Sequence, residues 1–484
     1  MRFSGNHQSA LQAATLVNEK INHEIHLGRI AGPFDEPPFF NFHSSPLGLV
    51  PKHDLGKFRL IHDLSFPRGD SINSYTSREF TTVKYETLDR VVELVRLCGR
   101  NCLIAKADIQ EAFRLIPIRS QDYPLLGFTW QGRYYHDKVL PMGSAVSCQT
   151  FERFSRALQW ILQTHFNVLR VTHLLDDYIF FGPANDSTCL HSLLSFERLA
   201  DDIGIPLNTG KRCPPSTCQV VYGIEIDTTA MELRLPADKL AKALSLVNRM
   251  SNCRKVTLRD LLSLIGLLSY CCLVVSAGRS FLRRLIDLAS GITRLHHYVT
   301  LNREARADLY AWKVFLHSFN GKSLFLEQRF LSADTIKLYT DASSENGFSV
   351  VFGKKWVAGT WHKRFNSSDI TLLELYPLVL ATEMFGQYLA NHCILFMSDN
   401  SGVVDIINKT TSRNQGIMKL VRHLVLACLR YNILFHARHV PGYQNVIADH
   451  LSRLQFGKAR QIAPWLDPTP ATIPDPLRPQ VLLA

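Results

Sequence analysis

Two adjacent acids, Asp176 and Asp177, interrupt an apolar run near the middle of the chain. Leu174 and Leu175 precede them, and the strand-forming residues 178–181 follow. This pattern predicts a β-hairpin whose tip carries both carboxylates. Two like charges about 4 Å apart repel by roughly 4 kcal/mol at an effective dielectric near 20, and binding of a divalent cation is the commonest reason to keep such a pair. An ordinary acidic turn is the alternative, so the rest of the chain must decide.

The size and charge of the chain narrow the classes of protein to consider. A chain of 484 residues is too long for one hydrophobic core and predicts two to four domains. Its net charge of +12 favours a polyanionic partner, with nucleic acid first, although a basic surface that only aids solubility is the alternative. The eleven cysteines lack metal-site spacing, and there is no signal peptide or long apolar span. We therefore expect an intracellular protein without a membrane partner, in either nucleus or cytoplasm.

The pattern of strand-like and helix-like segments changes along the chain. A mixed region comes first, then a run of amphipathic helices, and then strands followed by alternating helices and strands, which indicate an independent α/β domain. Recurring prolines near the end predict an extended tail. Five segments are expected: an N-terminal extension (1–45), the mixed region (46–235), the helical region (236–331), the α/β domain (332–456) and a proline-rich tail (457–484).

Four further motifs flank the acid pair in a fixed order. Asp108 ends a predicted strand and is followed by Phe113, and residues 141–143 precede an amphipathic helix. After the acid pair, Lys211 ends a turn and residues 222–223 lie in a strand. This ordered set resembles the palm motifs of reverse transcriptases. The resemblance implies that Lys211 donates a proton to the departing pyrophosphate, with a solvated turn lysine as the alternative.

The resemblance further implies an α+β multidomain protein with a right-hand polymerase fold. Residues 46–235 would form the fingers and palm, and residues 236–331 the helical thumb and connection. Asp108 and Asp176 would bind two magnesium ions for phosphoryl transfer, with Asp177 supporting the site. Magnesium suits a site with oxygen ligands alone, and manganese is the expected substitute.

The same resemblance implies residues that bind the incoming dNTP. Lys52 and Arg59, in a predicted fingers hairpin, would grip the triphosphate. Phe113 would lie under the sugar and exclude a 2′-hydroxyl, although a simple core position is the alternative. Gly143 would let the backbone approach the nascent base pair closely. Met142 stands where retroviral enzymes usually carry glutamine.

Four more acids recur in the predicted α/β domain. Asp341 and Asp399 end strands, Glu374 opens a helix, and Asp449 lies in the last predicted helix of that domain. Their order and spacing resemble ribonuclease H. This implies a second two-ion magnesium site, which cuts the RNA strand of a hybrid with water as the nucleophile. His439 matches the mobile histidine that helps product leave or shuttles a proton in that family, and a solvated loop histidine is the alternative.

Some segments are similar to one group of elements in particular. Residues 59–73 and 278–284 resemble DIRS-type retrotransposons, which carry a tyrosine recombinase. The resemblance covers about residues 30–456. No segment of the chain resembles a recombinase, so a separately encoded recombinase is an expected partner.

The combined hypothesis is an RNA-directed DNA polymerase with a linked ribonuclease H that copies retrotransposon RNA into DNA. Its expected partners are an RNA template, a DNA primer, the RNA–DNA hybrid and dNTPs. One alternative is a host-captured, non-catalytic protein that binds RNA or hybrids through the same basic surface. A DNA-dependent or template-independent polymerase is the other.

Overall fold

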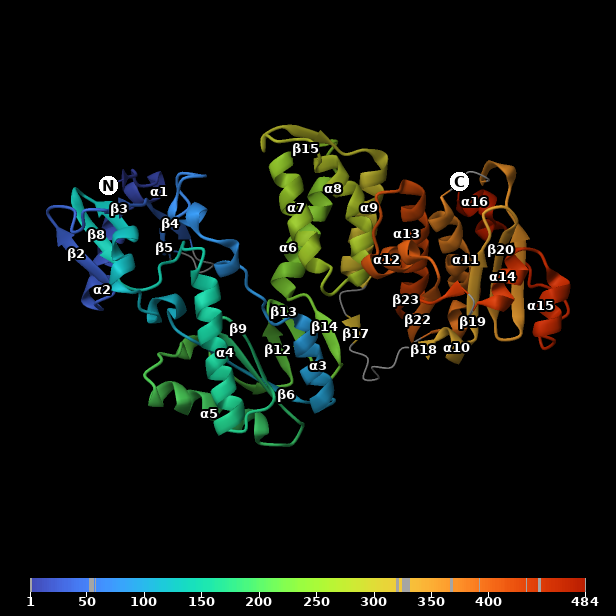
Figure 1. The fold of residues 1–484 in the computed structure, drawn as a ribbon, viewed down its shortest axis with the longest axis horizontal. Helices are drawn as coiled ribbons and strands as arrows, with labels where there is room; N and C mark the ends of the chain where they lie inside the picture. Colours follow the sequence, from blue (N-terminus) through green and yellow to red (C-terminus); the bar gives the residue numbers. More distant parts are fainter. Residues whose placement is uncertain are drawn as a thin grey trace. The chain divides into compact units, whose positions relative to one another are not determined.

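The computed structural model describes residues 2–51, 56, 58–318, 322–323, 331–365, 369–390, 392–431, 433–442 and 445–483 (Figure 1). The chain divides into two compact units, Met1–Met231 and Glu232–Ala484. Each unit combines helices with β-sheets, as the predicted α+β class requires. Among the described residues, no helix combines the length and apolar character needed to span a membrane.

A five-stranded sheet forms one part of the first unit. Its strands, in spatial order, are β1 (Arg2–Phe3), β3 (His43–Ser44), β7 (Gly127–Trp130), β8 (Arg133–Asp137) and β2 (Ile30–Phe34). Helices α1 (Gln8–Leu11) and α2 (Ala14–His26) share a core with this sheet, in which Val17 and Ile21 pack with Phe128 and Trp130. The segment predicted as an N-terminal extension therefore supplies strands and core side chains to this unit.

The hairpin β4 (Leu47–Pro51) and β5 (Phe58–His62) joins the same core through Leu47 and Leu49. Its strands match the hairpin that the sequence predicts in this segment. The loop between the two strands falls mostly outside the described residues, and so does Lys52.

A second, four-stranded sheet carries the acid pair. Its order is β11 (Cys213–Ser216), β6 (Leu103–Asp108), β10 (Asp177–Gly182) and β9 (Val171–Leu174). Residues 178–181 of β10 are fully buried, which explains their unbroken apolar run. Helices α4 (Ser147–His165) and α5 (Thr188–Asp202) share a core with Tyr178 and Phe180, and α3 (Leu88–Cys98) also contacts β10. Strands β12 (Cys218–Val221) and β13 (Ile224–Asp227) pair beyond this sheet.

The second unit begins with the predicted helices. They are α6 (Ala237–Ser251), α7 (Leu258–Cys271), α8 (Arg283–Ala289) and α9 (Arg303–Ser318). Two short antiparallel strand pairs accompany them: β14 (Glu232–Arg234) with β17 (Lys322–Ser323), and β15 (Lys255–Thr257) with β16 (Tyr298–Thr300). Trp312 of α9 is fully buried against the glycine at position 278, where a Cβ would lie 2.1 Å from the indole ring.

The rest of the second unit is an α/β region with antiparallel and parallel strands. The antiparallel strands are β19 (Leu338–Ala342), β20 (Gly347–Phe352) and β21 (Lys355–Thr360). The parallel strands are β18 (Leu331–Ser332), β22 (Cys393–Ser398) and β23 (Leu434–His439). The helices are α11 (Ile370–Phe385), α12 (Ser401–Lys409), α13 (Gln415–Arg430) and α14 (Val446–Ser452). Helix α11 is apolar on nearly all sides because it contacts β19, β20 and α13.

A buried ion pair joins the helical and α/β regions within this unit. Asp308 of α9 and Arg422 of α13 are both buried and lie 3.3 Å apart. The Arg422 guanidinium also lies over the Phe281 ring at 5.5 Å. Asp308 also pairs with Arg284 at 3.2 Å, so removing Asp308 would leave the buried Arg422 without this partner, and the contact holds the two regions together at this point.

The prediction of an extended C-terminal tail is wrong. Helix α15 (Phe456–Ile462) continues the fold, and the Trp356 indole donates a hydrogen bond to the Asp467 carbonyl at 2.8 Å. Further on, the Tyr376 hydroxyl donates to the Leu477 carbonyl at 2.7 Å. Two prolines of this segment lie in the first turn of short helices, Asp475–Leu477 and α16 (Pro479–Leu482), and Leu482 is buried.

Candidate active sites

The β-ladder of the four-stranded sheet brings the three predicted palm acids together. Asp108 is the last residue of β6, Asp177 is the first of β10, and the two are direct cross-strand partners. Directly opposed residues point to the same face of a sheet. Asp176 lies in the turn between β9 and β10, where its carbonyl accepts a hydrogen bond from the Ile109 amide at 3.0 Å. The predicted hairpin with an acidic tip is therefore confirmed.

Burial and mutual repulsion make this group of acids costly to ionise. Burial, with the neighbouring Asp176 carboxylate, raises the pKa of Asp177 to about 6. Burial and the Asp108 carboxylate also raise the pKa of Asp176. Opposed like charges on adjacent strands destabilise a sheet, so this geometry calls for a cation. All the donor atoms are carboxylate oxygens, which suits a hard divalent ion.

Lys211 supplies one positive charge to the group. It lies at the end of a short 3-10 helix (Thr209–Lys211), and its Nζ donates to Asp108 Oδ1 at 2.7 Å. The Asp108 side chain is only 4% exposed, whereas that of Lys211 is 60% exposed. Although burial opposes it, the Asp108 carboxylate raises the pKa of Lys211. The lysine is therefore an ion-pair partner of the acids rather than a freely solvated turn residue.

Phe113 and Arg59 lie on elements that adjoin the acids. Phe113 belongs to the 3-10 helix Ala112–Leu115, which follows β6, and its half-buried ring meets Phe151 edge-on at 5.8 Å. Its ring therefore contacts the core while part of it stays accessible. Arg59 of β5 is exposed, and its charge lowers the pKa of Asp176, although burial is the larger influence and raises it.

Met142 and Gly143 lie in the loop before α4, against strand β5. The His62 amide donates to the Met142 carbonyl at 3.0 Å. Gly143 has φ +131°, and a Cβ at this position would lie 1.9 Å from the His62 carbonyl oxygen. Only glycine fits this close approach between the two backbones.

The substitution Gly143→Ala should therefore destabilise the first unit. The added methyl group must displace the His62 backbone, and the alanine backbone must hold a φ that is strained for any residue with a Cβ. Together these effects should cost about 1–3 kcal/mol of stability. Thermal unfolding of the variant should begin at a lower temperature than in the unaltered protein. Gly5→Ala is the control, because a Cβ at that position meets nothing within 4 Å. Equal unfolding temperatures for the two variants would contradict the packing described here.

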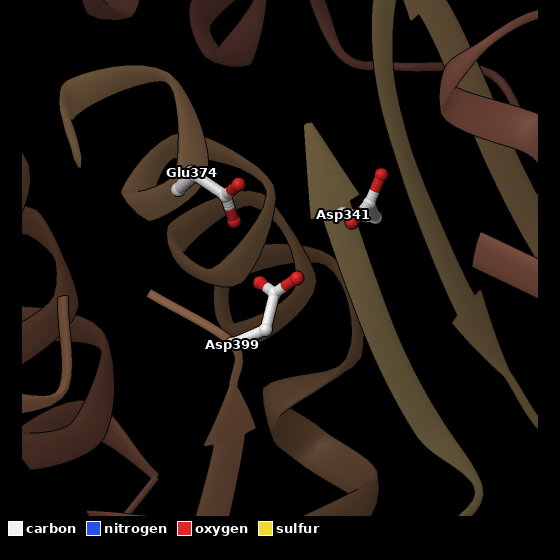
Figure 2. A group of neighbouring side chains, drawn as sticks. All are labelled: Asp341, Glu374 and Asp399. Atoms are coloured by element: carbon white, nitrogen blue, oxygen red, sulfur yellow. The ribbon is translucent and has the colours of Figure 1, made fainter. Parts of the chain in front are cut away.

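A second group of acids lies in the α/β region. Carboxylate oxygens of Asp341, Glu374 and Asp399 lie within 4.8 Å of one another. Figure 2 shows Asp341 on a strand, Glu374 on a helix and Asp399 just beyond the end of another strand. Burial first, and then the other two acids, raises the pKa of Glu374 to about 8. Burial likewise raises the pKa of Asp341 to about 6.

Asp449 lies near this group without belonging to it. Its carboxylate contacts Arg453 at 2.7 Å on the same helix face. Its charge still contributes to the raised pKa of Asp341, after burial. Ser452, which our sequence analysis missed, donates to Asp341 Oδ2 from the next turn of α14. The three-residue spacing from Asp449 is the signal that places Ser452 on the same face.

His439 lies at the end of β23, next to the acid group. Its exposed ring places Nε2 3.0 Å from the Asp399 carbonyl oxygen. In the following loop, a Cβ at Gly442 would lie 2.9 Å from Asp399 Oδ2. The structure therefore brings the predicted histidine to the Asp399 end of the group and leaves its ring accessible.

The raised pKa values predict how stability changes with pH when no metal is bound. The folded-state pKa of Glu374, about 8, lies above its ordinary value of 4.5, so the fold favours the protonated form. This contribution to stability is complete below pH 4.5 and is lost as the pH rises toward 8. In EDTA, the unfolding temperature should fall across this range, and it should fall less in Glu374→Gln. Millimolar Mg²⁺ should raise it at pH 8 in the unaltered protein but not in this variant.

Glu345→Gln is the control for this prediction, because Glu345 is exposed and is not among the charges that raise the pKa of Glu374. This variant should follow the unaltered protein at every pH. If Glu374→Gln loses as much stability as Glu345→Gln between pH 5 and 8, the ionisation of Glu374 is not what destabilises the fold in this range.

Comparisons with known proteins agree with this geometry. Residues 50–217 match the family described as "Reverse transcriptase (RNA-dependent DNA polymerase)". The match includes Asp108, Asp176 and Asp177, so the first unit contains a reverse transcriptase domain. A polyprotein of Cassava vein mosaic virus is 20% identical over 433 residues, which are 85% of this chain and 61% of that protein. The chain therefore spans less than two thirds of the length of this relative.

Solved structures of similar fold are foamy viral enzymes. The foamy viral protease-reverse transcriptase in complex with an RNA/DNA hybrid has a TM-score of 0.53 and 14% identity, over 98% of this chain and 56% of that chain. The same protein in complex with dsDNA has a TM-score of 0.51 and 14% identity, over 91% of this chain and 85% of that chain. At these identities the likeness concerns the fold, and it confirms the predicted polymerase fold class.

Proposed function

We propose that this chain is an RNA-directed DNA polymerase with a linked ribonuclease H. The observation that carries the proposal is a pair of separate acid groups, one in each compact unit. The first contains Asp108 and Asp177 as cross-strand partners within the reverse transcriptase match. The second gathers Asp341, Glu374 and Asp399 within 4.8 Å. Two groups of closely spaced acids, in which carboxylates outnumber the paired cations, support two magnesium-dependent reactions on nucleic acid.

At the polymerase site, Asp108, Asp176 and Asp177 would hold two Mg²⁺ ions, with Mn²⁺ as a substitute. The ions would activate the primer 3′-hydroxyl and neutralise charge on the triphosphate. Lys211 already lies within 2.7 Å of Asp108 and is mostly exposed, so it can reach a pyrophosphate near the acids. Its ammonium would then donate a proton to the leaving group.

Residues around these acids would bind the dNTP. Arg59 would contact the triphosphate from β5, where its charge already acts on Asp176. The accessible part of the Phe113 ring would exclude a 2′-hydroxyl. The backbone of Met142 and Gly143 would lie against the nascent base pair, and Lys52 would assist Arg59.

At the nuclease site, Asp341, Glu374, Asp399 and Asp449 would hold two Mg²⁺ ions beside the RNA strand of a hybrid. The ions would activate water and stabilise the departing 3′-oxygen. Asp449 would first have to leave Arg453, a contact exposed enough to exchange. His439, accessible at the Asp399 end, would assist product release or proton transfer.

The proposed activities assign a role to each region of the chain and identify its binding partners. Residues 46–235 would act as fingers and palm, 236–331 as thumb and connection, and 332–456 as the nuclease. The chain would bind an RNA template, a DNA primer, their hybrid and dNTPs, consistent with its net charge of +12. The source would be a DIRS-type retrotransposon, whose separately encoded recombinase completes integration.

Two assays on the full chain test the proposal. With Mg²⁺, the protein should extend a DNA primer on an RNA template and, separately, cleave the RNA of a preformed hybrid. EDTA should stop both reactions. A protein that binds hybrids but performs neither reaction would be the non-catalytic binder. Extension on DNA templates alone, or without a template, would identify a different polymerase class.

A further inference from the structure

Four charged side chains clamp the turn that carries Phe113. From the N-terminal segment come Glu24 of α2 and Arg29, which follows it. From the turn after β6 come Glu111 and Arg114, which flank Phe113. Each segment supplies one acid and one arginine, and each arginine pairs with the acid of the other segment: Arg114 contacts Glu24 at 2.7 Å, and Arg29 contacts Glu111. Two residues outside the reverse transcriptase match thus hold both sides of a turn inside it.

The Arg114 guanidinium is the centre of this clamp. Its Nε and Nη2 both donate to Glu24 Oε2, at 2.9 and 2.7 Å. Its Nη1 donates to Asp137 Oδ1 of β8 at 2.7 Å. The side chains of Arg114, Glu24 and Asp137 are 11%, 17% and 4% exposed. Charges so little exposed are expensive unless paired, so these contacts hold the turn in one position.

The same cluster reaches the other side of the proposed nucleotide pocket. Asp137 Oδ2 lies 2.9 Å from His62 Nδ1, and His62 Nε2 lies 3.0 Å from the Gly127 carbonyl oxygen. The His62 backbone carbonyl is the group against which Gly143 packs. A displacement of the Arg114 side chain would therefore shift the positions of both Phe113 and Gly143.

We propose that Glu24 is a positioning residue for nucleotide selection, acting through Arg114 on the Phe113 ring. The inference rests on the proposed function, because it assumes that Phe113 discriminates dNTPs from rNTPs. Phe113 lies in a single short turn between Glu111 and Arg114, and its ring packs at the edge of the core that includes Phe151, so the position of this turn sets how far the ring projects from that core. A purely structural cluster would affect unfolding and leave discrimination unchanged.

The test measures kcat and KM for one dNTP and its matching rNTP in primer extension by the full chain on an RNA template. Glu24→Gln keeps the shape of the side chain and removes its charge. It should lower dNTP-over-rNTP discrimination by about 10-fold, because small displacements of a positioning group have large kinetic effects. The KM for dNTP should rise more than kcat falls. Glu19→Gln, an equal charge change on the exposed face of the same helix, should match the unaltered protein.

A double variant shows whether Glu24 acts through the ring. Phe113→Val alone should lower discrimination by about 100-fold. Adding Glu24→Gln should then lower it no further, because the two residues act as one unit. If Glu24→Gln lowers the unfolding temperature but leaves discrimination unchanged, the positioning role is overturned. If Phe113→Val leaves discrimination unchanged, the error lies in the proposed role of Phe113, and the inference falls with it.

Arg29→Gln is the second variant, for use if Glu24→Gln does not fold. It removes the contact of Arg29 with Glu111 and its longer contact with Glu24 at 3.9 Å, and it keeps the contacts of Arg114 with Glu24 and Asp137. Discrimination should fall several-fold, in the same direction as for Glu24→Gln. Unchanged discrimination in a folded Arg29→Gln protein would overturn the clamp.

Discussion

Asp108→Asn and Asp176→Asn should each abolish primer extension on an RNA template and leave hybrid cleavage at the rate of the unaltered protein. Asparagine keeps the size of the side chain and removes the charge that a divalent ion requires. We expect losses of about 10³-fold or more in kcat, as for other residues that act as a unit in catalysis. Gel-resolved primer extension and cleavage of a labelled hybrid, on the same protein preparation, measure both activities.

Loss of folding would not explain this result for Asp176. Burial and Asp108 raise the pKa of Asp176, so its carboxylate is unfavourable in the folded protein. Replacing it with a neutral amide should therefore preserve or raise the unfolding temperature without metal. Asp201→Asn, an exposed acid on α5, is the control and should keep both activities. If both activities disappear in a folded Asp176→Asn protein, the model of two independent sites is wrong.

Asp341→Asn and Asp399→Asn should have the opposite effect. Hybrid cleavage should fall by about 10³-fold or more, and primer extension should continue at the rate of the unaltered protein. The reason is geometric: Asp341, Glu374 and Asp399 gather in the second unit, whereas the palm acids lie in the first. Cleavage of a labelled RNA strand, followed over time, gives the rate.

Asp405→Asn provides the matched control for the nuclease variants. Asp405 is exposed on α12 and pairs with Lys409 at 2.7 Å, so its removal costs little. Residual cleavage above roughly 10% of the normal rate in Asp399→Asn would contradict the expected loss of about 10³-fold and would mean that Asp399 is not a metal ligand.

Much of both sites could be predicted from the sequence because their residues lie at the ends of local elements. Asp108, Asp177 and Asp341 lie at or near strand ends that apolar patterning reveals. The β9–β10 hairpin needs only neighbouring residues to form. The helical segments of residues 237–318 were also readable, because an amphipathic period is a local property.

Contacts between distant segments could not be read in this way. The proline-rich end looked extended, yet Trp356 and Tyr376 bind its carbonyl groups across more than a hundred residues. Ser452 escaped notice because a serine in a helix carries no signal of its own. Asp449 stays a predicted metal ligand, and its carboxylate pairs with Arg453 one turn further along the same helix.

The amino-acid order alone determined which residue types end the strands, and with them the two sets of acids, because strand and helix periods depend on near neighbours. Only the tertiary structure decided which charges meet. Glu24 and Arg114 are ninety positions apart, and their ion pair exists because α2 packs on the sheet beside the turn after β6. Pairing of buried charges depends on the packing of whole elements, which no local pattern specifies.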